Sequence, residues 1–116
     1  GLRKYQQQQA AINIENAHIS MLSARAEIYK EALLSTNNLE AAILQYQAAQ
    51  KTLQVWQVYF NTTLQKVQRG EVKIKDFESV KNSFFTIQQN AEIAKYDWLL
   101  KKKIYQYYST GNMEDL

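Results

Sequence analysis

One stripe of apolar residues, spaced by alternate steps of three and four, runs through the last part of the chain. Such steps keep side chains on one face of an α-helix, whereas a β-strand would scatter them over both faces. Because the repeat holds a strict seven-residue period, it predicts a narrow coiled-coil seam. The stripe consists of Phe77, Val80, Phe84, Ile87, Ala91, Ala94, Trp98, Lys101, Tyr105 and Tyr108. Only Lys101 among them is neither apolar nor aromatic.

The residues at the two ends of this stripe are typical of helix boundaries. Asp76 is a good N-cap residue, and Glu78 follows in the first turn, where negative charge is favoured. Three lysines at 101–103 lie near the C-terminal end, and Gly111 is placed to end the helix. We therefore expect a helix over about residues 76–109.

A second stripe with helical spacing lies upstream, within residues 38–69. It consists of Leu39, Ile43, Tyr46, Ala49, Leu53, Trp56, Phe60, Leu64 and Val67. A flanking set widens the apolar face beyond what a two-stranded coiled coil needs: Ala42, Val55, Val58 and Tyr59. This helix is therefore expected to contact neighbours on two sides.

Residues 1–34 carry a weaker helical pattern, and the polar run Ser35–Asn38 follows it. The chain has no proline and no glycine between Gly1 and Gly70, so one uninterrupted helix over about residues 2–69, roughly 100 Å long, is one prediction. The alternative is a break at Ser35–Asn38, because Asn37 and Glu40 could form a capping box that opens a new helix.

Gly70 is suited to end the first helix in the left-handed conformation, after Lys66 and Arg69 in its last turn. Residues 70–75 are too few for a strand of consequence, so they predict a compact tip. The fold class expected is all-α, an elongated antiparallel coiled-coil hairpin that forms a single domain over residues 1–116. The first 30 residues are then left without a partner inside the chain.

The composition of the chain argues mainly against certain classes of function. The net charge of +3 is too small to argue for a nucleic-acid partner, and the absence of cysteine excludes a disulfide scaffold and a thiolate metal site. No nucleophile–base pair, phosphate-binding glycine loop or enclosed carboxylate pair is present. We therefore expect neither an enzyme nor a cofactor or metal site. No stretch of about 18 apolar residues predicts a transmembrane helix.

Short motifs at both ends of the return helix resemble the TolC-like outer membrane factors. In that family a long periplasmic helix ends in a glycine tip, and the returning helix carries an A-x-Y-D/N-x-L signature before a closing glycine. The matching pieces here are Val67–Glu71, Ile74–Phe77, Asn82–Ser83, Ala94–Leu99 and Thr110–Asn112. The resemblance as a whole covers residues 39–116, whereas residues 1–38 match only in length and helicity.

The resemblance implies a periplasmic α-helical tunnel segment of a Gram-negative outer membrane channel for efflux or type I secretion. The family's membrane-crossing β-strands and its other repeat are missing, so the chain is expected to be part of a larger protein. By resemblance the parent would be a homotrimer whose hairpins pack side by side. The 22 glutamines and asparagines suit a polar face on a water-filled lumen.

The same resemblance implies two roles for the tip. It would dock a periplasmic adaptor (membrane fusion) protein, and the expected docking residues are Arg69, Gly70, Glu71, Lys73, Lys75 and Asp76. Asp76 is also the candidate for narrowing the tunnel aperture, where a ring of carboxylates would attract cations. The alternative from another class is a free-standing three-helix or coiled-coil interaction module unrelated to transport.

Overall fold

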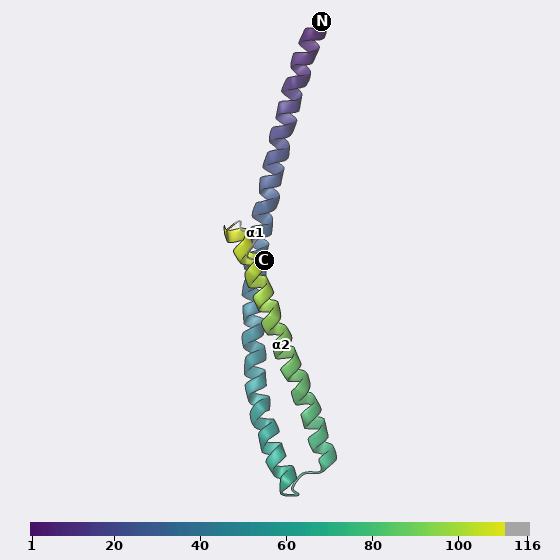
Figure 1. Ribbon diagram of the computed structural model, residues 1–116, viewed down its shortest axis with the longest axis vertical. Helices are drawn as coiled ribbons and strands as arrows, with labels where there is room; N and C mark the ends of the chain where they lie inside the picture. The colour runs from purple at the N-terminus through teal and green to yellow at the C-terminus, as the bar shows by residue number, and fades with distance from the viewer. Residues whose placement is uncertain (111–116) are drawn as a thin grey trace. The chain divides into compact units, whose positions relative to one another are not determined.

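The computed structural model describes residues 1–110 and contains two α-helices. Helix α1 spans Leu2–Gln68 (67 residues) and helix α2 spans Ile74–Thr110 (37 residues). Within the described residues there is no β-strand, and α2 returns antiparallel to the second half of α1 (Figure 1). The predicted all-α helical hairpin is confirmed, and each helix boundary lies within two residues of its expected position.

Helix α1 continues without a break through Ser35–Asn38. The capping box predicted as an alternative at Asn37 and Glu40 does not form, because both residues lie inside the helix. Four short polar residues cost a helix interior only a few tenths of a kcal/mol each, so in the absence of proline or glycine nothing there enforces a stop. Residues 1–110 therefore contain two helices, as the continuous reading predicted, and not three.

The chain divides into two compact units, residues 1–34 and the residues from 35 onward. The first unit is a single helical stretch whose side chains at positions 1–30 are all exposed. Large apolar side chains are among them, with Ile14 at 71% and Tyr29 at 74% exposure. An apolar surface of this kind is uncommon on a monomeric protein and marks residues 1–34 as a candidate interaction segment.

The second unit is the hairpin, and on α1 its seam is a strict heptad. The seam residues, all buried or half-buried, are Ser35, Leu39, Ala42, Tyr46, Ala49, Leu53, Trp56, Phe60, Thr63 and Val67. The predicted members Ile43 and Leu64 are half-buried, but the buried Ala42 and Thr63 beside them hold the heptad positions, which shifts the prediction by one residue at these two turns. With that correction, the steps alternate between four and three along the whole seam, as a coiled coil requires.

On α2 the predicted stripe is the observed seam. Phe84 and Ala91 are buried at 3% exposure each, and every predicted position except Tyr105 is buried or half-buried. Tyr105 lies at the limit, with 36% exposure. Lys101, the polar exception, is half-buried and pairs with Asp97, whose carboxylate lies 3.2 Å from its ammonium.

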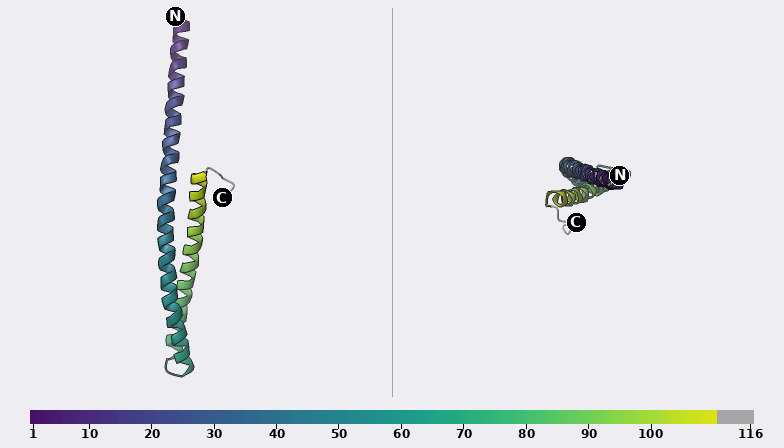
Figure 2. Two further views of the ribbon diagram at one scale, coloured as in Figure 1. Left: turned by 90° about the vertical axis from the view of Figure 1, so that its left-hand side faces the viewer. Right: turned by 90° about the horizontal axis from the view of Figure 1, so that it is seen from above.

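Aromatic pairs across the seam set the register of the two helices. Phe60 stacks on Phe84 with ring centroids 4.7 Å apart, and Tyr46 stacks on Trp98 at 5.2 Å. Tyr46 and Phe60 are 14 residues apart on α1, and Phe84 and Trp98 are the same 14 residues apart on α2. Both pairs therefore belong to one antiparallel register, and the two helices lie side by side in both views of the hairpin (Figures 1 and 2).

Candidate functional site: the hairpin tip and the outer stripes

The tip begins where α1 ends in a Schellman motif. The amide of Glu71 donates to the carbonyl of Lys66 at 2.9 Å, and the amide of Gly70 donates to that of Val67 at 3.1 Å. Gly70 has φ of +77°, the left-handed conformation that this motif needs. Glycine adopts it without the steric cost that a Cβ imposes, so the predicted role of Gly70 is confirmed.

Helix α2 begins at Ile74, two residues before the expected position. The carbonyl of Lys73 accepts hydrogen bonds from the amides of Asp76 (3.0 Å) and Phe77 (3.1 Å), which makes Lys73 the residue that precedes the first turn. The prediction that Asp76 is the N-cap is therefore wrong, because it lies inside the first turn of the helix. Its carboxylate still lies at the positive end of the helix dipole, where a negative charge is favourable.

Charged residues cover the outside of the tip. All six residues expected to dock an adaptor are exposed, and the structure brings them together within one turn and the two adjoining helix ends: Arg69, Gly70, Glu71, Lys73, Lys75 and Asp76. The ion pair between Arg69 and Glu71, at 3.8 Å, is solvated on both sides and adds little stability. These side chains are therefore available to a partner.

Val72 is the exception within the turn. It is half-buried and lines a hollow with Tyr59, Thr63 and Val80, so it anchors the turn against the hairpin. With Val72 turned inward and Gly70 held by hydrogen bonds, the tip presents its polar residues on a defined backbone. Pre-ordering of this kind lowers the entropy cost of docking.

The late motif at Ala94–Leu99 has a packing role in the structure. Trp98 stacks on Tyr46 and so joins the two helices, whereas Asp97 pairs with Lys101 one turn along α2 and supports its own helix. Asp76 is exposed, and its role at a tunnel aperture stays a prediction because it needs several copies of the chain. The closing residues Gly111 and Asn112 lie outside the described residues.

The sequence interpretation missed a second apolar surface, on the side of α2 away from the seam. Phe85, Ile93, Tyr96 and Leu100 are between 48% and 66% exposed and share one face of the helix. On α1 the corresponding face carries Leu44, Val55, Val58 and Tyr59, of which the last three were expected to widen the apolar face. We call these two sets the outer stripes. Their signal in the sequence is helical spacing in a phase different from that of the seam.

No group of three or more His, Cys, Asp or Glu side chains among residues 1–110 could hold a metal ion. Neither described helix contains a stretch that is both long enough and apolar enough to span a membrane. No protein family, curated protein or solved structure matches the chain.

Proposed function

We propose that the chain is the periplasmic helical segment of a TolC-like outer membrane channel for efflux or type I secretion. Its role in such a channel is to build the tunnel wall by lateral packing and to dock an adaptor with its tip. One observation carries the proposal: the two outer stripes mirror each other in the register of the hairpin.

The helix face that carries the outer stripe of α1 runs through positions 44, 48, 51, 55 and 59, and the face that carries that of α2 runs through positions 100, 96, 93, 89 and 85. Within one hairpin, Tyr46 faces Trp98 and Phe60 faces Phe84. Consider a second hairpin placed beside the first without an axial shift, so that its α2 lies along the α1 of the first. The contact between the two chains then has the same register as the contact inside each hairpin. Leu44 then meets Leu100, Ala48 meets Tyr96 and Tyr59 meets Phe85.

The paired positions complement each other in size and charge. The small Ala48 leaves room for the large ring of Tyr96, and Lys51 lies at the level of Glu92 and Ile93 of the neighbour. Since the two faces differ, the contact is heterologous, and repeated contacts of this type close into a ring when the rotation permits. Every helix then has two neighbours, one across the seam in its own chain and one across the outer stripe in the next chain.

A polar face remains on α1 between the seam and the outer stripe. Gln47, Gln54, Asn61 and Gln68 recur at intervals of seven residues and are exposed. In a ring of hairpins, a face of this composition would remain hydrated without a strong electric field, which suits the wall of a water-filled tunnel. The expected homotrimer of the parent protein is one way to close such a ring.

Sedimentation equilibrium tests the lateral packing. Leu44→Gln with Leu100→Gln removes apolar area from both outer stripes with little change in helix propensity. We expect the native chain to associate in a concentration-dependent manner and the double variant to be monomeric. Leu2→Gln with Ile14→Gln is the matched control, because both residues are large, apolar and at least as exposed as Leu44 and Leu100 but lie outside the hairpin. Loss of association in the control alone, or a monomeric native chain, would refute the packing.

Photo-crosslinking tests the docking role of the tip. A photoreactive residue at Lys73, in Gram-negative cells that express the parent protein, is expected to trap a membrane-anchored periplasmic protein identified by mass spectrometry. The same group at Gln54, on the polar face of α1, is the control and should not trap that protein. Adducts from Lys73 only with other copies of the chain would contradict adaptor docking.

One observation favours the alternative, a coiled-coil interaction module unrelated to transport. Residues 1–34 expose apolar side chains at helical spacing, including Ile19, Leu22 and Leu33. If this segment forms the functional interface, association should persist in the Leu44→Gln, Leu100→Gln variant and be lost in the Leu2→Gln, Ile14→Gln variant. The sedimentation experiment thus separates the two functions.

A further inference from the structure

A crevice with apolar walls lies between the helices at the open end of the hairpin, the end opposite the tip. Helix α1 contributes Leu39 and Ile43, and α2 contributes Trp98, Lys102, Tyr105 and Gln106. Four of these six side chains are aliphatic or aromatic, and the two polar ones both come from α2. A mostly apolar hollow with a few polar groups at its edge is the usual composition of a small-molecule site.

The seam residues beside the crevice do not fill it. Ala42 is buried to 2% exposure but carries only a methyl group. Lys101 occupies the α2 seam at this level, and its ammonium is drawn to the carboxylate of Asp97 at 3.2 Å. Neither residue supplies a large apolar side chain to fill the hollow that Trp98 lines.

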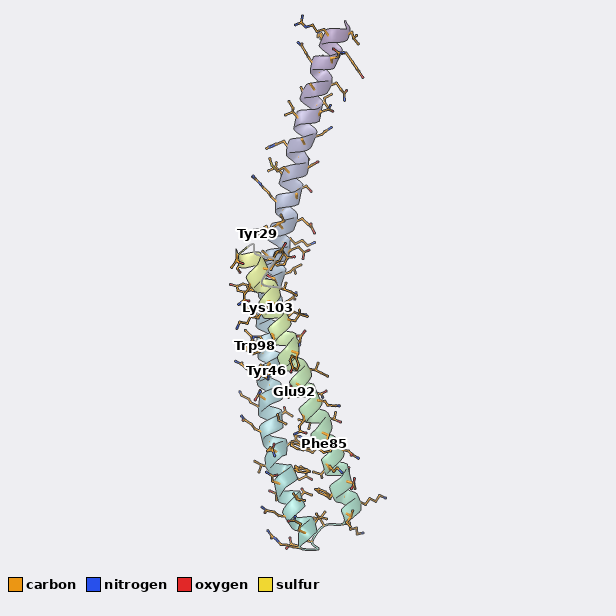
Figure 3. All side chains as sticks on the ribbon, viewed as in Figure 1. Tyr29, Tyr46, Phe85, Glu92, Trp98 and Lys103 are labelled. Carbon is orange, nitrogen blue, oxygen red and sulfur yellow. The ribbon has the colours of Figure 1, made fainter. Side chains whose placement is uncertain are left out.

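Positive charge gathers at the rim. The ammonium of Lys102 lies 5.7 Å from the centroid of the Trp98 ring, and Lys103 is the next residue on the exposed side of α2 (Figure 3). Within residues 1–110, no carboxylate lies within 4.0 Å of either ammonium, in contrast to Lys101. Two cations with no acidic partner among residues 1–110, beside an apolar hollow, match a ligand that joins a hydrocarbon to an anion.

We propose that this crevice binds a single-chain anionic amphiphile, such as a long-chain carboxylate. Its hydrocarbon chain would lie against Leu39, Ile43 and Trp98, and its carboxylate would pair with Lys102, with Lys103 as a second cation nearby. Burial of the methylene groups supplies most of the affinity, and the lysines select for the anion. The site is independent of the outer stripes, so it does not depend on lateral assembly.

Quenching of tryptophan fluorescence tests the location of the bound chain. The protein has two tryptophans, so Trp56→Phe leaves Trp98 as the sole reporter, while the difference in quenching between the native chain and Trp56→Phe gives the contribution of Trp56 with the crevice intact. The probe is dodecanoate with a terminal bromine, a contact quencher, used below its micelle concentration. We expect saturable quenching of Trp98 and none of Trp56. Equal quenching of both, or none up to the solubility limit of the probe, would overturn the proposal.

Charge variants test the head-group contact. Lys102→Gln with Lys103→Gln should weaken binding of the carboxylate by about fivefold, the loss of an ion pair at a solvated rim. Lys73→Gln with Lys75→Gln is the matched control, because it removes the same charge at the tip and should leave the dissociation constant unchanged. Equal weakening by the two pairs would show a general effect of net charge and reject the site.

Two further probes separate the possible sources of the anion. Brominated dodecanol, with the same hydrocarbon and no charge, should bind about fivefold more weakly than the carboxylate and equally to both charge variants. Vesicles of brominated phosphatidylglycerol should quench Trp98 less than the free amphiphile does, because a bilayer retains its acyl chains. Quenching by vesicles alone would indicate a membrane-binding surface in place of a crevice for a free amphiphile.

Discussion

The phenol ring of Tyr46 stacks on the indole of Trp98, with centroids 5.2 Å apart and planes inclined by 22° (Figure 3). Gln50 donates a hydrogen bond of 2.7 Å to the Tyr46 hydroxyl from one turn away, which orients the phenol. This contact holds α1 and α2 in register at the end of the hairpin away from the turn. It also places Trp98 at the wall of the proposed crevice.

A double-mutant cycle measures the coupling between these two residues. Tyr46→Leu and Trp98→Leu retain apolar bulk but remove the ring stack, so each should lower the free energy of unfolding. The coupling energy is expected to be about 0.5–1.5 kcal/mol, the range for aromatic pairs. Urea unfolding followed by circular dichroism gives all four values. Additive single effects would show that the rings do not interact in solution.

Phe84 and Phe85 are adjacent in the sequence but differ in burial, and their substitution should have different effects. Phe84 is 3% exposed and stacks on Phe60, whereas Phe85 is 48% exposed. Phe84→Ala is expected to lower the free energy of unfolding by about 3 kcal/mol. Phe85→Ala serves as the control and should change it by less than about 1 kcal/mol in the dissociated chain. Similar effects of the two substitutions would place the seam on the wrong face of α2.

Gly70 carries the positive φ of the turn, so Gly70→Ala should destabilise the hairpin by about 1–2 kcal/mol. A Cβ on Gly70 would meet no atom within 4 Å, so the cost comes from the backbone conformation alone. Gly70→Asn should cost less, since asparagine tolerates the left-handed region better than alanine. Thermal unfolding of both variants provides the comparison. If alanine were as stable as glycine, the turn would have another conformation in solution.

Proline at position 37 tests whether α1 is continuous. Asn37 lies in the helix interior and is exposed, so Asn37→Pro should cost about 3 kcal/mol or more and reduce the helical circular dichroism signal. Asn37→Ala at the same position should raise helicity slightly, because alanine has the higher helix propensity. If the proline variant kept the full helical signal, residues 35–38 would have to be a loop between two helices.

The seam of α2 could be predicted from sequence because large apolar residues mark almost every turn. The seam of α1 was harder, since Ala42 and Thr63 are small and their neighbours Ile43 and Leu64 are the stronger apolar signals. Thr63 tolerates burial because its hydroxyl donates to the carbonyl of Tyr59 at 2.8 Å. A seam packed against aromatic rings needs such small residues, but hydrophobicity alone does not reveal them.

The tip and the outer stripes were also only partly predictable from the sequence. Gly70 was predictable because a single residue type fits the left-handed turn. The start of α2 was not, since Asp76 is the best capping residue by composition, whereas the turn hydrogen-bonds to the carbonyl of Lys73. Phe85 follows the seam residue Phe84 and Tyr96 stands between two charged residues, and their match to Tyr59 and Ala48 follows only from the register that the ring pairs define.

Cysteine cross-linking tests the lateral packing most directly. The chain has no native cysteine, and Leu44 and Leu100 lie on the sides of their helices away from the seam, so a disulfide between Leu44→Cys and Leu100→Cys must join two chains. The control pair, Leu44→Cys with Phe85→Cys, is out of register by about 22 Å. The account predicts covalent oligomers from the first pair and monomers from the second under mild oxidation. Monomers from the first pair, or equal cross-linking of both pairs, would contradict it.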